Sequence, residues 1–173
     1  MTTKILPINE QSLNQAAAII RSGGLVAFPT ETVYGLGADA LSPQAVKKIF
    51  EAKGRPGDNP LIVHISSPEN LPQIVREIPS EAETLLRRFA PGPLTLVLKR
   101  NYNIPNEVTA GLDTVGVRIP SHPAARAFIN ACGRPIAAPS ANLSGSPSPT
   151  SAQHVLADLS GRIEIILDGG PCS

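Results

Sequence analysis

The chain has 173 residues, of which 42% are hydrophobic, 18 are Pro and 14 are Gly. This composition excludes a disordered linker and a collagen-like fibre, and the length suits one domain over residues 1–173. Because 15 basic residues face 14 acidic ones, the net charge of +1 gives no global attraction for nucleic acid or for an anionic membrane.

Helical and strand signals alternate along the first half of the chain. Apolar residues recur at helical spacing over residues 10–21, and Gly23 with Gly24 ends that helix. Ser42 followed by Pro43 is a typical helix start, because serine caps a helix and proline suits its first turn. The expected elements are a helix at 10–21, a strand at 25–28, a helix at 42–52, a strand at 61–65 and a helix opened by Ser67 and Pro68.

The second half of the chain continues the alternation. Residues 80–83 have the pattern of a capping box, in which the first and fourth side chains bond to the helix start. The expected elements are a helix at 80–89, strands at 94–98 and 115–119, a helix from Ser121 to about residue 131, a strand at 136–138, a helix capped by Thr150 and a strand at 163–167. This order predicts an α/β fold in which helices flank a twisted, mostly open mixed sheet.

Several standard sites are excluded by context. Gly35 to Ala40 matches a dinucleotide-binding fingerprint, but the strand before it ends too early and the helix after it begins too late. There is no phosphate-binding Walker string and no nucleophile elbow. The scattered histidines, together with Cys132 and Cys172, form neither a metal-ligand pattern nor a disulfide framework. The N-terminus lacks a signal-peptide core, so we expect a soluble cytoplasmic protein without a membrane segment.

Five polar, proline-rich segments follow or flank the predicted strands, where open α/β sheets present ligand-binding loops. They are residues 29–36, 53–60, 61–65, 115–123 and 137–150. Each has a plainer interpretation: a turn that bonds its own backbone for 29–36, a core histidine for His64, and an ordinary loop for 137–150.

Two of these segments carry cations whose partners the sequence leaves open. Lys53 and Arg55 lie two residues apart on a chain that Gly54 and Pro56 keep non-helical, so both can point at one polyanion such as a triphosphate. A solvated charge cluster is the alternative. Arg118 interrupts an apolar strand, where burial requires an anionic ligand or a structural salt bridge.

Taken together, the five segments resemble the YrdC-like family of threonylcarbamoyl-AMP synthases over most of the chain. The paired Lys53 and Arg55, and the paired Ser140 and Asn142, match the signature of that family. The resemblance implies a YrdC-like fold and the condensation of L-threonine, bicarbonate or CO2, and ATP into threonylcarbamoyl-adenylate and pyrophosphate. It implies that the product serves N6-threonylcarbamoylation of adenosine 37 in tRNA through a downstream transfer complex.

The resemblance also implies roles for individual residues. ATP contacts fall on Lys53, Arg55, Asn59, Thr114, Ser140, Asn142 and Ser148, of which Lys53, Arg55, Ser140 and Asn142 are expected to be catalytic. The L-threonine pocket falls on Thr32, His64, Arg118 and the backbone of Ala138, with Thr30 and Tyr34 lining the same site. Mg2+ is expected through the ATP phosphates, without a metal site made by the protein. Because the threonine carbamate attacks the α-phosphorus, no catalytic Ser or Cys is needed, and the protein positions reactants and neutralises charge.

One departure from the family concerns the end of the sequence. In the family, the turn corresponding to Asp168–Gly170 leads into a Gly-x-x-Ser-Thr-Val strand whose serine helps hold threonine, but this sequence ends at Ser173. We therefore expect a sheet that lacks its last strand and exposes an edge, and weaker threonine binding.

Two other functions stay open at the level of sequence. A double-stranded RNA-binding or ribosome-maturation protein of the same fold could use Lys47, Lys48, Lys53 and Arg55 on a basic face, with direct tRNA contact as a variant of this idea. The homologous domain of carbamoyl transferases for hydrogenase maturation ranks lower, because no acylphosphatase or zinc-finger segment accompanies it.

Overall fold

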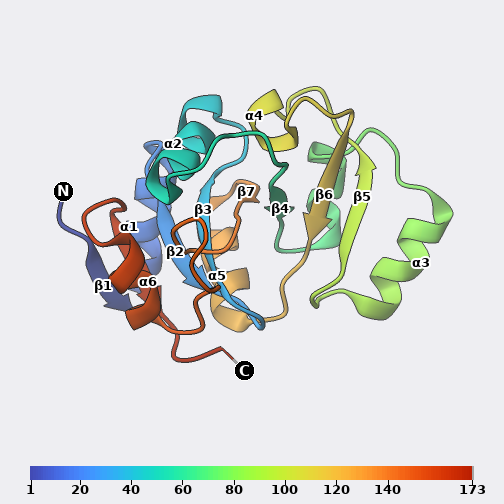
Figure 1. Cartoon of the computed structure of the whole chain (residues 1–173). Helices are drawn as coiled ribbons and strands as arrows, with labels where there is room; N and C mark the ends of the chain where they lie inside the picture. Colours follow the sequence, from blue (N-terminus) through green and yellow to red (C-terminus); the bar gives the residue numbers. More distant parts are fainter. Residues whose placement is uncertain (173) are drawn as a thin grey trace.

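An eight-stranded mixed sheet forms the centre of the chain in the computed structural model, which describes residues 1–172 (Figure 1). Its strands are β1 (Lys4–Pro7), β2 (Val26–Pro29), β3 (Tyr34–Asp39), β4 (Ile62–His64), β5 (Thr95–Lys99), β6 (Thr114–Arg118), β7 (Ile136–Ala137) and β8 (Ile165–Asp168). Their order is β1-β8-β2-β3-β7-β4-β6-β5, with β1 and β5 at the edges. β8 pairs in parallel with β1 and β2, as β4 does with β6, and the other four pairings are antiparallel. The expected mixed α/β sheet is confirmed.

Helices connect and cover the strands. They are α1 (Glu10–Arg21), α2 (Pro43–Lys53), the 3-10 helix η1 (Pro68–Gln73), α3 (Ser80–Phe89), α4 (Asn106–Thr109), α5 (Pro123–Cys132) and α6 (Ala152–Leu159). The predicted start of α2 is confirmed, because the Ser42 side chain accepts a hydrogen bond from Ala45 N and Pro43 occupies the first turn. None of the helices described in residues 1–172 has the length and apolar character needed to span a bilayer.

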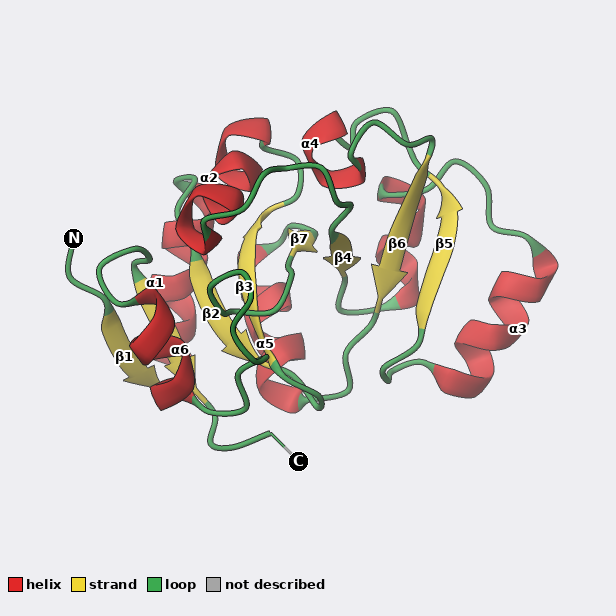
Figure 2. Ribbon diagram, viewed as in Figure 1, coloured by secondary structure: helices red, strands yellow, loops and turns green. Residues whose placement is uncertain are grey.

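Helices pack on both faces of the sheet because neighbouring residues of a strand point to opposite sides. In β2, Phe28 packs in a cluster with α1 and α5, whereas Ala27 packs in a second cluster with α2, α4 and α6. Figure 2 shows α1 and α5 behind the sheet and α6 in front of it. The ends of the strands and the loops that follow them are therefore the places left open for a ligand.

Strand β3 was not predicted, and its first three residues, 34–36, belong to the segment that the sequence indicated as a polar loop. Its two glycines alternate with larger residues, and a Cβ atom on Gly37 would lie 2.8 Å from Ile136 Cγ2 and 3.1 Å from Phe28 Cε1. Glycine is required here because these neighbours already fill the space. The glycines that mimic a dinucleotide fingerprint are thus strand residues packed against Phe28 and Ile136.

Other differences from the prediction involve short elements and helix starts. β1 and α4 each have four residues, too few for a periodic signal to indicate them. The helix predicted after Ser67 is the 3-10 helix η1, which contains Pro72, a residue without a backbone donor. The caps are Pro79, His122 and Ser151 in place of Ser80, Ser121 and Thr150. The expected loss of a final strand lies beyond the described residues and stays a prediction.

Candidate functional site

The turn between β2 and β3, residues 30–33, connects the polar segments that the sequence singled out. We call it the Glu31 turn. On one side, Glu31 contacts Arg118 at the end of β6 and Ser121 just after it. On the other side, β3 bonds to the segment after β7, through Leu36 N to Pro139 O and through a bridge between Gly35 and Ser140. Segments far apart in sequence therefore meet at one place, as expected.

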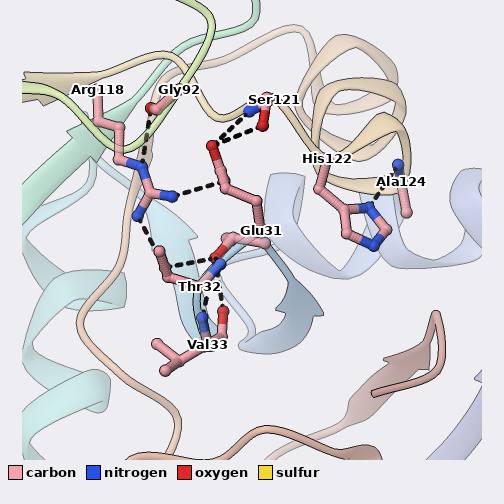
Figure 3. A network of polar contacts seen from close by, with 9 residues as sticks. Glu31, Thr32, Val33, Gly92, Arg118, Ser121, His122 and Ala124 are labelled. Atoms are coloured by element: carbon pink, nitrogen blue, oxygen red, sulfur yellow. Dashed lines mark hydrogen bonds and ion pairs between the residues drawn. The ribbon is translucent and has the colours of Figure 1, made fainter. Parts of the chain in front are cut away.

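Arg118 is the cation of the first group of contacts (Figure 3). Its side chain is only 11% exposed, and its Nη2 lies 2.6 Å from Glu31 Oε1. Nε donates to Gly92 O at 3.3 Å and Nη1 donates to Thr32 Oγ1 at 3.4 Å. The anionic partner that this buried cation requires is thus supplied by the protein itself, so the salt bridge left open by the sequence is present.

Glu31 is the residue that the sequence-based assignment of the pocket missed. Its Oε2 accepts hydrogen bonds from Ser121 N at 2.9 Å and from Ser121 Oγ at 2.8 Å. Burial acts to raise the pKa of Glu31, but the Ser121 hydrogen bonds and the Arg118 charge outweigh it and hold that pKa below its ordinary value. The sequence did contain a signal for this ion pair: Glu31 on a polar turn and Arg118 in an apolar strand each lack a partner of opposite charge nearby in the sequence.

His64 and Arg118 are neighbours across strands, because β4 and β6 pair them in register. His64 is 4% exposed, its Nδ1 lies 3.2 Å from Ile62 O, and its ring meets Phe28 edge-on. Burial first, and then the charge of Arg118, lower the pKa of His64 to about 4. The ring is therefore neutral near pH 7, and the tautomer with a proton on Nδ1 would donate to the carbonyl of Ile62.

Three hydroxyl side chains lie in or next to the Glu31 turn: two of them bond only within the protein, and one is open to a ligand. Thr30 is buried, and its Oγ1 donates to Val33 O at 2.7 Å, so this residue shapes the turn as the plainer interpretation expected. The Tyr34 hydroxyl is also internal, donating to Gly170 O and accepting from Gly169 N, and burial first raises its pKa to about 12. Thr32 is exposed beside Arg118 and remains accessible to a ligand.

The segment after β7, residues 139–146, forms the second side of the site. We call it the serine loop. Asn142 is 6% exposed, and its Nδ2 donates to Leu143 O at 2.7 Å and to Ser146 O at 2.9 Å, so its amide donors hold the loop itself. Ala138, just before the loop, uses its N–H on Ile62 O, which leaves only its carbonyl as a backbone contact for a ligand.

The paired cations Lys53 and Arg55 have different surroundings. Lys53 is 2% exposed, and its Nζ donates to Ser140 O at 2.5 Å and to Asn142 O at 2.8 Å. Burial first, then the charge of Arg55, lower its pKa to about 8 against an opposing effect of Asp158. Arg55 is half-buried with its guanidinium 5.3 Å from the centre of the Phe50 ring, and its buried Nε has no hydrogen-bond partner.

The remaining residues assigned to ATP lie farther from this centre. Asn59 is exposed after α2, and Ser148 lines an open hollow of about 290 Å³ beside α6. Thr114 starts β6, whereas Arg118 ends it, so their backbones are separated by roughly 13 Å at the usual rise of a strand. The structure gathers Ser140, Asn142 and Lys53 closely and leaves Thr114 at the opposite end of its strand.

No group of three or more His, Cys, Asp or Glu side chains within residues 1–172 is arranged to hold a metal ion. The site also contains the cations Arg55 and Arg118, which suit anionic ligands such as carboxylates and phosphates.

Comparisons with known proteins agree with the fold. The Sua5/YciO/YrdC family model, described as "Telomere recombination", matches residues 18–173. The threonylcarbamoyl-AMP synthase of Pyrococcus abyssi is 62% identical over 94% of this chain and 48% of its own length. The Bacillus subtilis enzyme of the same name is 57% identical over 98% of this chain and 49% of its own.

A solved structure extends the comparison to three dimensions. The crystal structure of P. abyssi Sua5 complexed with L-threonine has a TM-score of 0.95 and 58% identity, covering 99% of this chain and 51% of that one. The chain thus spans about half the length of the curated relatives described here. Since the family model covers nearly the whole sequence, this chain belongs to the Sua5/YciO/YrdC family.

Proposed function

We propose that the chain synthesises L-threonylcarbamoyl-adenylate from L-threonine, bicarbonate or CO2, and ATP, with release of pyrophosphate. The observation that carries this proposal is the grouping of Arg118, Thr32 and neutral His64 beside a loop rich in hydroxyl and amide groups. A carboxylate, a hydroxyl and an amine are the groups of threonine, and these three side chains offer a partner for each. The names of the relatives support the same reaction.

Arg118 suits the threonine carboxylate even though Glu31 is bound to it. A guanidinium has five N–H donors, and the contacts to Glu31, Gly92 and Thr32 use three of them. One donor remains on each Nη atom, and we propose that these two N–H groups bind the carboxylate. In the tautomer that carries its proton on Nδ1, the Nε2 atom of neutral His64 is an acceptor for the substrate hydroxyl or amine.

For the nucleotide, we propose contacts from Arg55, Asn59, Thr114, Ser140, Asn142 and Ser148. Mg2+ would be held through the phosphate oxygens, because the described residues contain no metal-binding cluster, and when bound it would neutralise phosphate charge. The guanidinium of Arg55, whose buried Nε has no hydrogen-bond partner in the described residues, is proposed to supply donors for a phosphate oxygen.

The proposed chemistry needs no nucleophile from the protein. The threonine amine forms a bond to the carbon of CO2 and loses a proton, giving a carbamate. A carbamate oxygen then bonds to the α-phosphorus of ATP, and the bond from that phosphorus to the bridging oxygen breaks as pyrophosphate leaves. The site contributes by holding the reactants close and by balancing their charge.

The product is a mixed anhydride, which hydrolyses readily in water. We therefore propose that a tRNA threonylcarbamoyl-transfer complex in the cytoplasm consumes it for N6-threonylcarbamoylation of adenosine 37. The alternative function in RNA binding loses one of its four expected cations, because Lys53 is buried under the serine loop.

The test is release of pyrophosphate from ATP by the purified chain. We expect release that requires both threonine and bicarbonate, and appearance of label from [14C]bicarbonate in an adenylate. Serine, which lacks one methyl group, serves as the matched substrate control. Pyrophosphate release that is independent of threonine and bicarbonate would contradict the synthase, and RNA affinity that falls steeply with salt, without turnover, would favour the binding protein.

A further inference from the structure

Lys53 differs from the other cations of the candidate site because it is almost fully buried without a carboxylate bound to it. Lysine is rarely buried to this degree unless its ammonium group is paired. Here the acceptors are two backbone carbonyls of the serine loop, those of Ser140 and Asn142, at 2.5 and 2.8 Å. Two of the three N–H groups of the ammonium therefore bind the loop, and the residue is only 2% exposed.

Lys53 also binds the serine loop through its main chain. Its carbonyl oxygen accepts a hydrogen bond from Ser144 N at 3.0 Å. One residue at the end of α2 thus makes three hydrogen bonds to three different residues of the loop. Side chain and main chain of the same residue thus hold the loop at this position.

The other side of the serine loop is anchored in the same way. Asp158 of α6 accepts from Leu143 N at 2.9 Å, and Ala141 N donates to Tyr34 O of β3 at 2.9 Å. Backbone groups at each position from 139 to 144 are therefore bonded to α2, α6 or β3. A loop fixed on three sides has little conformational entropy left to lose when a ligand binds.

We propose that Lys53 is a positioning residue, which holds the serine loop in its ligand-binding shape and does not itself contact the triphosphate. This inference rests on the proposed function only in taking a nucleotide as the ligand of the loop. Arg55 follows Gly54, which adopts a left-handed conformation (φ 66°) and reverses the direction of the chain after α2. The two cations consequently have different surroundings: Lys53 is buried, whereas Arg55 is half-buried and its Nε has no hydrogen-bond partner.

The decisive experiment is hydrogen–deuterium exchange of the full chain without nucleotide, followed on a peptide that covers residues 139–146. Lys53→Met keeps the length of the side chain and removes its donors and charge. We expect at least about tenfold faster exchange of the serine loop, since each hydrogen bond to a charged group contributes enough for a factor of this size. Lys47→Met is the matched control, an exposed lysine of the same helix, and Arg55→Met is the comparison. Both should leave exchange of the loop unchanged.

A second readout separates contact with phosphate from positioning. The ATP dissociation constant is measured by calorimetry at low and at high ionic strength. Arg55→Met should weaken ATP binding and reduce its salt dependence, because a cation that touches the triphosphate is lost. Lys53→Met should weaken binding but reduce its salt dependence less than Arg55→Met does, because the main change is in the fraction of molecules with a formed loop.

Failure of the proposed role of Lys53 and failure of the proposed synthase activity give different experimental results. Unchanged loop exchange in Lys53→Met, or loss of salt dependence in that variant alone, would overturn the positioning role even if the chain is an active synthase. Absence of threonine-dependent pyrophosphate release would contradict the synthase without affecting the exchange result. Should Lys53→Met fail to fold, Asp158→Ala removes the anchor on the opposite side of the loop and must give the same acceleration.

Discussion

Two nearly buried cations, Lys53 and Arg118, each belong to one side of the candidate site, and their partners are different. Lys53 donates to neutral backbone carbonyls, whereas Arg118 is paired with the carboxylate of Glu31. Carbonyls satisfy an ammonium group and leave its charge uncompensated. A carboxylate compensates the charge of the guanidinium while leaving two of its N–H donors unused.

Because of this difference, one cation shapes the site and the other can contact the ligand. The donors of Lys53 are directed at the chain itself, so its contribution is the shape of the serine loop. Arg118 is oriented by Glu31 and Gly92 and still has donors to offer, so it can bind a carboxylate without being rearranged. The type of residue is a weaker guide to its role than the acceptors that already surround it.

The largest effect is expected for Arg118→Ala. Removal of the guanidinium takes away the proposed carboxylate partner and leaves Glu31 without its ion pair, so the threonine KM should rise at least about 30-fold. The ATP KM should change little. Steady-state pyrophosphate release with each substrate varied in turn measures both, and Arg126→Ala, an exposed arginine of α5, is the control. A change confined to the ATP KM would show that Arg118 serves the nucleotide.

The charge of Lys53 predicts an unusual dependence of stability on pH. Its pKa is about 8 in the folded chain and near 10.5 when exposed, so between these values the unfolded state binds more protons. The free energy of unfolding of the wild-type chain should therefore rise with pH, relative to Lys53→Met, by up to about 3 kcal/mol across this window. A neutral amine keeps two N–H donors for its two carbonyls, so the loop stays bound.

Urea denaturation of the two proteins from pH 7 to pH 10.5 measures this difference. Lys47→Met provides the control for titration elsewhere, because its side chain is exposed. A difference that falls as pH rises would mean that the charged form of Lys53 is favoured in the folded chain, contrary to the burial that the structure shows.

Glu31 predicts the opposite dependence, at acid pH and with a smaller effect. Its pKa is lowered on folding, so its contribution is fully present above the ordinary pKa of 4.5 and is lost as pH falls through the folded value. Glu31→Gln should lower the free energy of unfolding by about 1–2 kcal/mol at pH 7, because an amide cannot accept from both Arg118 and Ser121 N. The two proteins should converge in stability below the folded pKa, as measured by urea denaturation.

Long regular elements and the order of the polar segments could be predicted from the sequence. Helix α1 has the predicted bounds because four apolar residues mark its buried face, and α2 begins at the predicted Ser42 cap. The proximity of His64 and Arg118 also follows from two apolar strands that each carry one polar residue at the same end.

The partners of the two cations could not be predicted in this way. Lys53 lies 87 positions from Ser140, and Glu31 lies 87 positions from Arg118, so no local pattern links the members of either pair. Lys53 and Arg55 look equivalent in sequence, and only the reversal at Gly54 and the packing of the serine loop distinguish them. Strand β3 was missed for a related reason, because its glycines indicate a turn until Phe28 and Ile136 are placed against them.

The smallest predicted effect concerns the helix that anchors the serine loop from the side of Asp158. Ser151 caps α6 by accepting a hydrogen bond from His154 N at 3.2 Å, although the sequence favoured Thr150. Ser151→Ala should therefore lower the free energy of unfolding by about 1 kcal/mol, and Thr150→Ala by less than about 0.5 kcal/mol. Both are measured by urea denaturation.

If Ser151→Ala also speeds exchange of residues 139–146, the cap of α6 contributes to the position of the loop through Asp158, and Lys53 is one of two anchors that act together. If exchange is unaffected, α6 holds the loop without its cap, and the larger share of the restraint lies with Lys53.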